Sequence, residues 1–317
     1  MDFLPPAAAA AAGVVGDACT LHQPTRLAAI CAFFACWTLL LLSARSIARR
    51  FWVSFELTDA AVRRGKSRDT FPLVVAIGVC SAAHACVVAL PSLHLAVQYL
   101  LYAHPRDTVY MWETHDEQMC AFFRSTQLMA VPFTGYLLFL NLGLVMRWES
   151  DWDNYVHHIG FLVLTLISTH YPIFPELGMF ALAMELSTIP LSFMLVLREP
   201  KGYEWALEQV LGPIFGITFM LTRVVLFGVA LFRHFSLYLS DPDVFSRGVG
   251  SDIPAGVMAT VQTCYVAMWC LQLYWAWAVI IKYLITGKQY GEEATVGEPA
   301  VAATTGKGTA ASGKKNA

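Results

Sequence analysis

Two adjacent histidines, His157 and His158, stand where a polar, acidic segment meets an apolar one. Residues 151–154 contain two aspartates and an asparagine, whereas residues 159–171 are uncharged and mostly apolar. Imidazole is costly to place at the edge of a bilayer, and it is the side chain best suited to proton or acyl transfer near neutral pH. This pair is therefore the first candidate for chemistry in the chain.

Both histidines have polar neighbours one helical turn earlier in the chain. In a helix, Asp153 lies one turn before His157, and Asn154 lies one turn before His158. A carboxylate bonded to one ring nitrogen fixes the tautomer and raises the basicity of the other nitrogen. We therefore predict that His157 and His158 are catalytic, with Asp153 orienting them and Asn154 contacting substrate. The alternative is two interfacial histidines that face lipid headgroups.

Two charged residues, Glu185 and Arg223, lie in the middle of consecutive apolar segments. If these segments are antiparallel spans, the two side chains reach the same depth, where an ion pair offsets much of the cost of burying each charge. Ser187, Thr188 and Pro190 follow Glu185 and predict a polar, kinked stretch. Such a stretch suits the wall of a cavity, with Glu185, Ser187 and Arg223 binding substrate. It equally suits a packed bundle held together by polar contacts.

The composition indicates that these groups lie in a lipid bilayer. The chain is 57% hydrophobic and 14% charged, with a mean hydropathy of +0.54. A membrane helix needs about 20 apolar residues. Seven segments satisfy this length or approach it: 27–47, 71–91, 121–146, 155–171, 175–197, 208–232 and 255–284. We therefore predict an all-α, polytopic membrane protein with about seven transmembrane helices. The apolar segment 92–103 is short, which predicts an interfacial or re-entrant element.

The distribution of basic residues predicts the orientation in the membrane. The densest basic stretch follows the first span and contains Arg49, Arg50, Arg63, Arg64, Lys66 and Arg68. The positive-inside rule places this loop, the histidine pair and the C-terminus in the cytosol, and the N-terminus in the lumen. The predicted domains are a tail at 1–26, a first membrane helix at 27–50, a basic cytosolic loop at 51–70, a six-helix membrane domain at 71–290 and a disordered tail at 291–317.

The last four residues have the form of a retrieval signal. Lys314 and Lys315 lie fourth and third from the C-terminus, which predicts binding to a retrieval coat and residence in the endoplasmic reticulum. The alternative is a polar tail that happens to end in two lysines. Cys19 and Cys120 fall on the predicted lumenal side, where the two could form a disulfide. The sequence has no motif for a metal, a bound cofactor or a nucleic acid, so we expect none.

Several of these residues together resemble the TLC-domain membrane proteins, the lipid-handling superfamily that includes the ceramide synthases. The resemblance rests on the His157-His158 doublet and on the segment Glu185-Leu186-Ser187-Thr188-Ile189-Pro190 in the next helix. Weaker matches are Ser81-x-x-His84-Ala85, Gly135-Tyr136 and Phe219-x-x-x-Arg223. By itself, His84 is interpreted as a packing histidine with satisfied hydrogen bonds.

The resemblance covers about residues 70–290 and implies a six-helix bundle around a lipid cavity, with the doublet at its mouth. In the ceramide synthases, the doublet takes part in moving an acyl chain from acyl-CoA to a long-chain base. Those enzymes carry aspartates in the helix after the doublet, whereas this chain has Glu185, as in the smaller TLC-domain proteins. We therefore favour a protein that senses, binds or regulates membrane lipids. The alternatives are an acyl-CoA-dependent acyltransferase and an endoplasmic-reticulum cargo or assembly factor.

Overall fold

The computed structural model describes residues 23–51, 56–63, 67, 69–102, 117–145, 152–170, 174–240 and 254–281. Within these ranges the chain is helical, apart from short connections and one isolated bridge between Leu57 and Pro200. Residues as far as Ala276 belong to one compact unit, and those from Trp277 belong to a second. The fold and the site described below concern the first unit.

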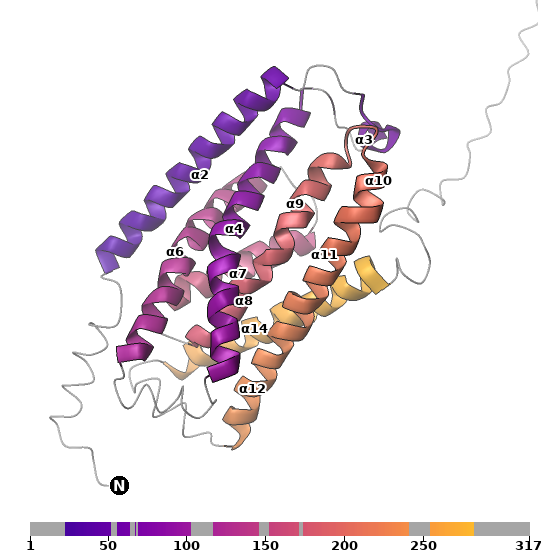
Figure 1. Cartoon of the computed structure of the whole chain (residues 1–317). Coiled ribbons are helices and arrows are strands. Elements are labelled where there is room, and N and C mark those ends of the chain that lie inside the picture. The colour runs from indigo at the N-terminus through magenta and orange to yellow at the C-terminus, as the bar shows by residue number, and fades with distance from the viewer. Residues whose placement is uncertain are drawn as a thin grey trace, which may run out of the picture. The chain divides into compact units, whose positions relative to one another are not determined.

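Four helices run without interruption through the first half of this unit. They are α2 (Gln23–Phe51), α4 (Phe71–Tyr102), α6 (Glu117–Val145) and α7 (Trp152–His170). A short helix, α3 (Asp59–Arg63), lies between α2 and α4 in the chain. Figure 1 shows α2 beside α4 and α6, and the contacts between these helices agree.

The second half of the unit is built from helices that change their winding along the way. One stretch is α8 (Pro175–Ala183), the 3₁₀ turn η1 (Met184–Ser187) and α9 (Thr188–Leu197). The next is α10 (Glu204–Ala206), the π-turn η2 (Leu207–Leu211), α11 (Gly212–Phe219), the π-turn η3 (Met220–Leu226) and α12 (Phe227–Ser240). The last is α14 (Ala255–Trp275), followed by the π-turn η4 (Ala276–Ile281).

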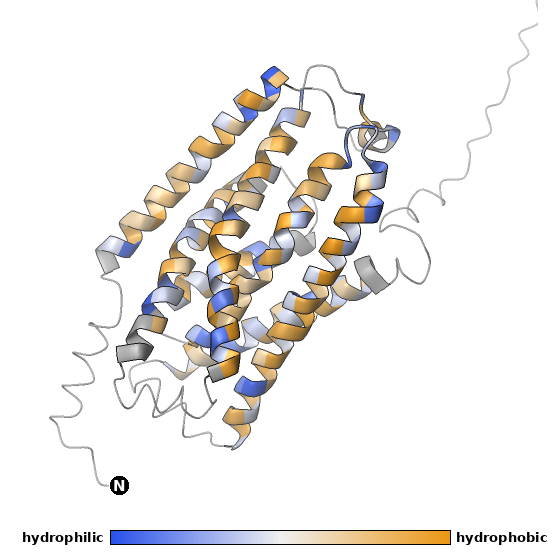
Figure 2. Ribbon diagram, in the orientation of Figure 1, coloured by the Kyte–Doolittle hydropathy of each residue, from blue (hydrophilic) through white to orange (hydrophobic). Residues whose placement is uncertain are grey.

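The predicted fold class is confirmed: the protein is all-helical and polytopic. Five helical stretches are long and apolar enough to cross a membrane: Thr25–Phe51, Phe71–Leu101, Pro175–Leu197, Glu204–Ser240 and Ala255–Ala278. Figure 2 shows hydrophobic residues over most of the length of α2, α4 and α11–α12. The other two predicted spans are helices α6 and α7. The apolar part of α7, Tyr155–Ser168, is shorter than a full span.

The prediction of a separate interfacial or re-entrant element at 92–103 is wrong over the described residues. Helix α4 continues through Pro91 and ends at Tyr102. A proline removes one backbone hydrogen bond, whereas ending the helix within an apolar environment would leave many backbone groups without hydrogen bonds. The helix therefore persists through the proline.

Small residues allow the helices around α4 and α6 to approach closely. A Cβ at Gly135 in α6 would lie 2.9 Å from the Cβ of Phe33 and 3.0 Å from the carbonyl oxygen of Ile30, both in α2. A Cβ at Gly78 in α4 would collide with the side chain of Val196 in α9. Glycines at such crossings let membrane helices pack backbone to backbone. This packing holds α6 against α2 and α4 against α9.

The largest apolar cluster joins α4, α6, α7, α8, α12 and α14, and includes Phe133, Leu137, Phe161, Phe180 and Phe227. A second cluster joins α2, α4 and α6 around Trp37 and Tyr136. The ring of His84 contacts members of both clusters, namely Phe133 of the first and Trp37 and Tyr136 of the second.

Candidate functional site

The 3₁₀ turn η1 positions the first polar group of the site. Pro190 has no N–H, so the carbonyl of Leu186 loses its helical partner four residues later. The chain tightens into Met184–Ser187 immediately before this point, and the helix then resumes as α9. Glu185 and Ser187 are buried in this turn, and Thr188 follows them.

The π-turn η3 positions the second polar group, Arg223. Single π-turns inside longer helices recur at functional sites because they redirect one side chain. Arg223 is 4% exposed. Its Nε donates a hydrogen bond to Ser187 Oγ (2.7 Å), its Nη1 to Gln272 Oε1 (3.2 Å), and its Nη2 to Thr188 Oγ1 (2.9 Å). The guanidinium therefore ties η3 to α9 and to α14.

The predicted ion pair between Glu185 and Arg223 is present. Arg223 Nη2 lies 3.7 Å from Glu185 Oε1, and the Thr188 hydroxyl donates a 2.8 Å hydrogen bond to Glu185 Oε2. Both charges are buried, with side-chain exposures of 5% and 8%. Because each is the other's counter-charge, the pair adds no net charge to the interior.

The two histidines of the doublet lie in α7 against α14. The His157 ring centroid is 5.1 Å from that of Trp275, 4.9 Å from that of Phe161 and 5.4 Å from that of His158. His157 is 7% exposed. The Nδ1 atoms of His157 and His158 are both buried and have no hydrogen-bond partner among the described residues.

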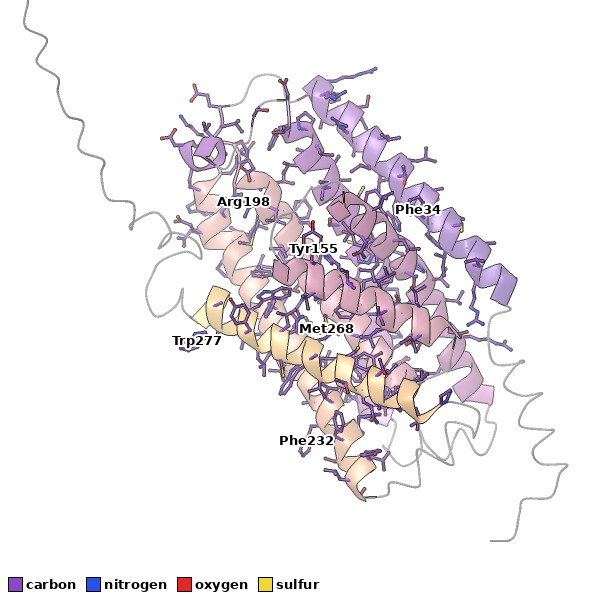
Figure 3. The ribbon with its side chains drawn as sticks, turned by 180° about the vertical axis from the view of Figure 1, so that it is seen from behind. Phe34, Tyr155, Arg198, Phe232, Met268 and Trp277 are labelled. Carbon is purple, nitrogen blue, oxygen red and sulfur yellow. The ribbon has the colours of Figure 1, made fainter. Side chains whose placement is uncertain are left out.

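Helices α7 and α14 bring the doublet toward Arg223. Figure 3 shows α14, where Met268 is labelled, alongside α7, where Tyr155 is labelled. The sulfur of Met268 would lie 3.0 Å from a Cβ at Gly160, and Trp275 contacts His157. Gln272 lies between Met268 and Trp275 in α14, and it is the residue that Arg223 contacts. Both histidines lie within electrostatic range of the Arg223 guanidinium. The doublet and the ion pair therefore form one cluster.

The predicted partners of the doublet, Asp153 and Asn154, lie at the start of α7, and their side chains fall outside the described residues. Their pairing with His157 and His158 stays a prediction. Cys19 and Cys120 also fall outside, as do Lys314 and Lys315.

His84 of α4 is a further member of the cluster. It is 0% exposed, and its ring stacks on Tyr136 (centroids 3.8 Å apart) and Phe133 (5.3 Å). It lies within electrostatic range of His158. Neither of its ring nitrogens has a hydrogen-bond partner among the residues described. The stacking agrees with the interpretation of His84 as a packing histidine, whereas the prediction that its hydrogen bonds are satisfied is wrong among the described residues.

The sequence analysis also missed Gln272. It is 0% exposed, and its Nε2 has no hydrogen-bond partner within the described part of the chain. The available signal was an amide inside an otherwise apolar span. We refer to His84, His157, His158, Glu185, Arg223 and Gln272 together as the polar cluster.

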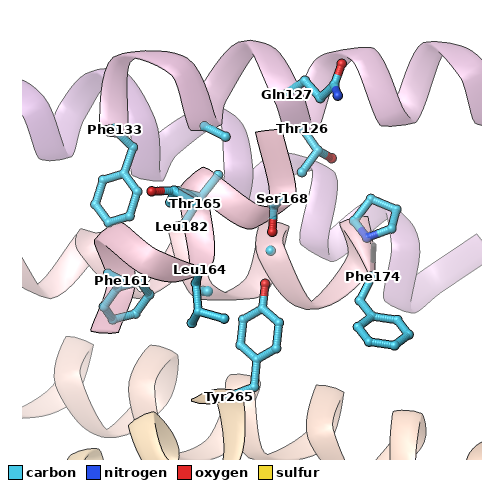
Figure 4. A pocket seen from close by; sticks show the side chains of 14 residues that line it. Thr126, Gln127, Phe133, Phe161, Leu164, Thr165, Ser168, Phe174, Leu182 and Tyr265 are labelled. Atoms are coloured by element: carbon cyan, nitrogen blue, oxygen red, sulfur yellow. The ribbon is translucent and has the colours of Figure 1, made fainter. Parts of the chain in front are cut away.

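A small cavity lies beside the polar cluster, between α6, α7, α8 and α14. Its volume is about 40 Å³, and its polar lining comes from Thr126, Gln127, Thr165, Ser168 and Tyr265. The Ser168 and Tyr265 hydroxyls face each other across it and share a hydrogen bond (Figure 4). About 10–15 Å³ of this measure holds one water molecule, so the cavity holds a few waters and no lipid.

Two aromatic rings separate the cavity from the polar cluster. Phe133 and Phe161 line the cavity and contact each other edge to face, with centroids 5.7 Å apart. On their other side, Phe133 stacks on His84, and Phe161 contacts His157. The histidine doublet does not line this cavity.

No group of three or more histidine, cysteine or acidic side chains is placed to hold a metal ion in the described residues. The cluster instead combines one neutralised ion pair, three imidazoles and an amide. These groups can donate and accept hydrogen bonds, and the imidazoles can transfer protons.

Comparison with known proteins agrees with this arrangement. Residues 75–281 match the TLC domain family model (TRAM, LAG1 and CLN8). No curated protein and no solved structure matches the chain. The matched region contains every member of the polar cluster and covers well over half of the chain. The protein is therefore a multi-pass membrane protein of the TLC domain family.

Proposed function

We propose that the protein binds the polar part of a membrane lipid at the polar cluster and that it acts in membrane lipid homeostasis. One observation carries the proposal: His84, His157, His158 and Gln272 all have buried polar atoms without a hydrogen-bond partner among the described residues. Each such atom costs about 1–3 kcal/mol of folding free energy. A bundle that needed only to be stable would gain by apolar residues at these positions.

Bound lipid would recover this cost. The polar group of the lipid would hydrogen-bond to the imidazoles and the Gln272 amide, and its acyl chains would follow apolar helix surfaces. Trp275, Phe133 and Phe161 pack around the histidines. The adjoining cavity, with a volume of about 40 Å³, is too small to hold such a lipid.

The histidine doublet also supports a second candidate function, acyl transfer from acyl-CoA. An imidazole nitrogen of His157 or His158 would attack the thioester carbonyl, and the C–S bond would break to release CoA thiolate. The hydroxyl or amine of an acceptor would then attack the acyl-imidazole. The C–N bond would break, and the acceptor's proton would pass to the second imidazole. The buried, unpartnered Nδ1 atoms favour this candidate, because a hydrogen-bonded nitrogen is a poorer nucleophile.

The expected location in the cell follows from the C-terminal tail and from the distribution of basic residues along the chain. Lys314 and Lys315 would retain the protein in the endoplasmic reticulum through coat binding, with the doublet toward cytosolic acyl-CoA. A role as a cargo or assembly factor rests on the same tail, which lies outside the described residues.

Mass spectrometry of purified protein tests the proposal. Wild type, His157→Ala/His158→Ala and the control His94→Ala, which changes an exposed histidine of α4, would be analysed for co-purifying lipid. We expect lipid in the wild type and the control, and little in the double variant. The same samples would be incubated with acyl-CoA and long-chain bases or lysolipids. A product that only the wild type and the control form would establish the acyltransferase. If the wild type yielded no co-purifying lipid and formed no product, both candidate functions would be refuted.

A further inference from the structure

Helix α2 carries an arginine near each end and no charged residue between them. Arg26 is its fourth residue, Arg45 precedes its last residue by six positions, and residues 27–44 are uncharged (Figure 2). The 19 positions from Arg26 to Arg45 correspond to about 28 Å of helix, which matches the roughly 30 Å hydrocarbon core of a bilayer. When α2 spans the membrane, both guanidinium groups therefore lie at the depth of the lipid headgroups.

Arg26 is a buried cation without a counter-charge in the described part of the chain. It is 8% exposed. Its Nε and Nη1 atoms, which carry three N–H groups, are buried and make no hydrogen bond to any described residue. The ion pairs of the described residues involve other basic side chains, namely Arg198, Lys201, Arg223 and His234. An isolated buried charge is unfavourable, so we expect an anion to balance Arg26.

A lipid phosphate is the anion that a bilayer supplies at this depth. The planar guanidinium fits the oxygens of a phosphate, and hydrogen bonds between two ionised groups are stronger than those between neutral ones. Phosphatidylcholine carries a cation beside its phosphate, which offsets part of the attraction to a second cation. Because no acidic side chain pairs with Arg26 among the described residues, this position favours a lipid with a net negative charge.

Helix α2 lies outside the region that the family model matches, because it precedes residues 75–281. It nevertheless packs closely against the helices of that region. Gly135 of α6 lies against the backbone of α2, and the Trp37 ring meets the His84 ring of α4 edge to face, with centroids 6.1 Å apart. A lipid that binds α2 at Arg26 would therefore stabilise an interface with both α4 and α6.

We propose that Arg26 binds the phosphate of an anionic phospholipid and that this lipid stabilises the packing of α2 against α4 and α6. The phosphate oxygens accept hydrogen bonds from the Nε and Nη1 groups that have no partner among the described residues. The lipid is a structural ligand at the edge of the bundle, and its binding does not depend on lipid binding at the polar cluster.

Thermal unfolding of the delipidated full-length protein in detergent tests the proposal. Wild type and Arg26→Gln would be unfolded alone and with equal concentrations of phosphatidylglycerol, phosphatidylcholine or inorganic phosphate. Arg50→Gln is the matched control, because it removes one positive charge from an exposed position of the same helix. We expect phosphatidylglycerol to raise the Tm of wild type and control by about 5 °C, and that of Arg26→Gln by less than about 2 °C. The other two additives should raise no Tm by more than about 2 °C.

The proteins without added lipid provide a second readout. Arg26→Gln should then unfold at the same temperature as wild type or at a higher one, because it removes a cation that has no counter-charge. A lower Tm for Arg26→Gln without lipid, together with an equal response to phosphatidylglycerol, would show that an acidic side chain elsewhere in the chain balances Arg26, and would overturn the proposal. Equal stabilisation of wild type by phosphatidylcholine or by inorganic phosphate would also overturn it.

Native mass spectrometry measures the bound lipid directly. Wild type and Arg50→Gln should retain one phosphatidylglycerol molecule, and Arg26→Gln should retain about fivefold less. Arg26→Lys replaces Arg26→Gln if the latter does not fold. Lysine keeps the charge but lacks the planar set of donors, so retention should fall about twofold. Equal retention by wild type and the folded Arg26 variant would refute the site.

Discussion

The ring of His84 lies flat against the ring of Tyr136, with centroids 3.8 Å apart and an angle of 8° between the planes. Tyr136 Oη also lies 2.6 Å from Ser81 Oγ, one turn before His84 in the same helix. Helix α6 therefore holds α4 by a stacked ring and by a hydrogen bond. The orientation of His84 is fixed by stacking, since its ring nitrogens have no hydrogen-bond partner in the described part of the chain.

Substitutions of Tyr136 should separate these two contributions. Tyr136→Phe keeps the stacked ring and loses the hydrogen bond to Ser81, which should lower the free energy of unfolding by about 1 kcal/mol. Tyr136→Leu also loses the aromatic stack and should cost roughly a further 0.5–1.5 kcal/mol. Unfolding in detergent, followed by circular dichroism, measures both. Equal losses in the two variants would show that the stack contributes nothing beyond burial.

The Glu185–Arg223 pair should show strong coupling in a double-mutant cycle. Glu185→Gln and Arg223→Gln each leave one buried charge without its partner, so each should cost about 3–5 kcal/mol of unfolding free energy. The double variant removes both charges. It should be more stable, by roughly 1–3 kcal/mol, than the sum of the two single-variant losses in unfolding free energy predicts. The measurement is unfolding of the four proteins under one detergent condition. Additive losses would mean that the 3.7 Å contact is not an energetic pair.

Substitution of Gly135 by alanine should disrupt the contact of α6 with α2. The new Cβ would lie 2.9–3.1 Å from Phe33 Cβ, Ile30 O and Phe34 N. Two of these atoms belong to the backbone and cannot rotate away, so we expect a loss of about 1–3 kcal/mol. Gly216→Ala in α11 is the matched control, because nothing lies within 4 Å of a Cβ there.

The control should be neutral or gain up to about 1 kcal/mol from the higher helix propensity of alanine. Thermal unfolding of both variants checks the difference. If Gly135→Ala were as stable as Gly216→Ala, α2 would be packed more loosely against α6 than the structure indicates.

The spans and the ion pair could be predicted because their signals run along the chain. Hydrophobic length marks a membrane helix, and Glu185 and Arg223 are conspicuous inside apolar segments. Segment 92–103 was predicted wrongly because it was interpreted by itself as too short to span, whereas helix α4 continues through Pro91 to Tyr102.

Gln272 and the surroundings of His84 depend instead on which helix faces which. Gln272 joins the polar cluster because α14 lies against α7 and η3, and His84 stacks on Tyr136 and Phe133 because α4 lies against α6. Helix pairing of this kind is not encoded in local hydrophobicity. The doublet was identified from its residue types, but its proximity to Arg223 depends on the packing of α14 against both α7 and η3.

The two histidines of the doublet should differ in how their loss affects stability. His157 is packed between Phe161 and Trp275, so His157→Ala should leave a void and cost about 2–4 kcal/mol of unfolding free energy. His158 is only partly buried, and His158→Ala should cost less than about 1 kcal/mol. If lipid binds through both rings, as we propose, each substitution should reduce co-purifying lipid at least fivefold.

His158→Ala therefore separates function from folding, and thermal unfolding together with lipid mass spectrometry of each single variant provides the measurement. His157→Phe is a useful companion, because it fills the space between Phe161 and Trp275 and removes both ring nitrogens. It should recover most of the stability that His157→Ala loses and none of the lipid. If His157→Phe retained wild-type lipid, the imidazole of His157 would be a packing group, and recognition would rest on His84, His158 and Gln272.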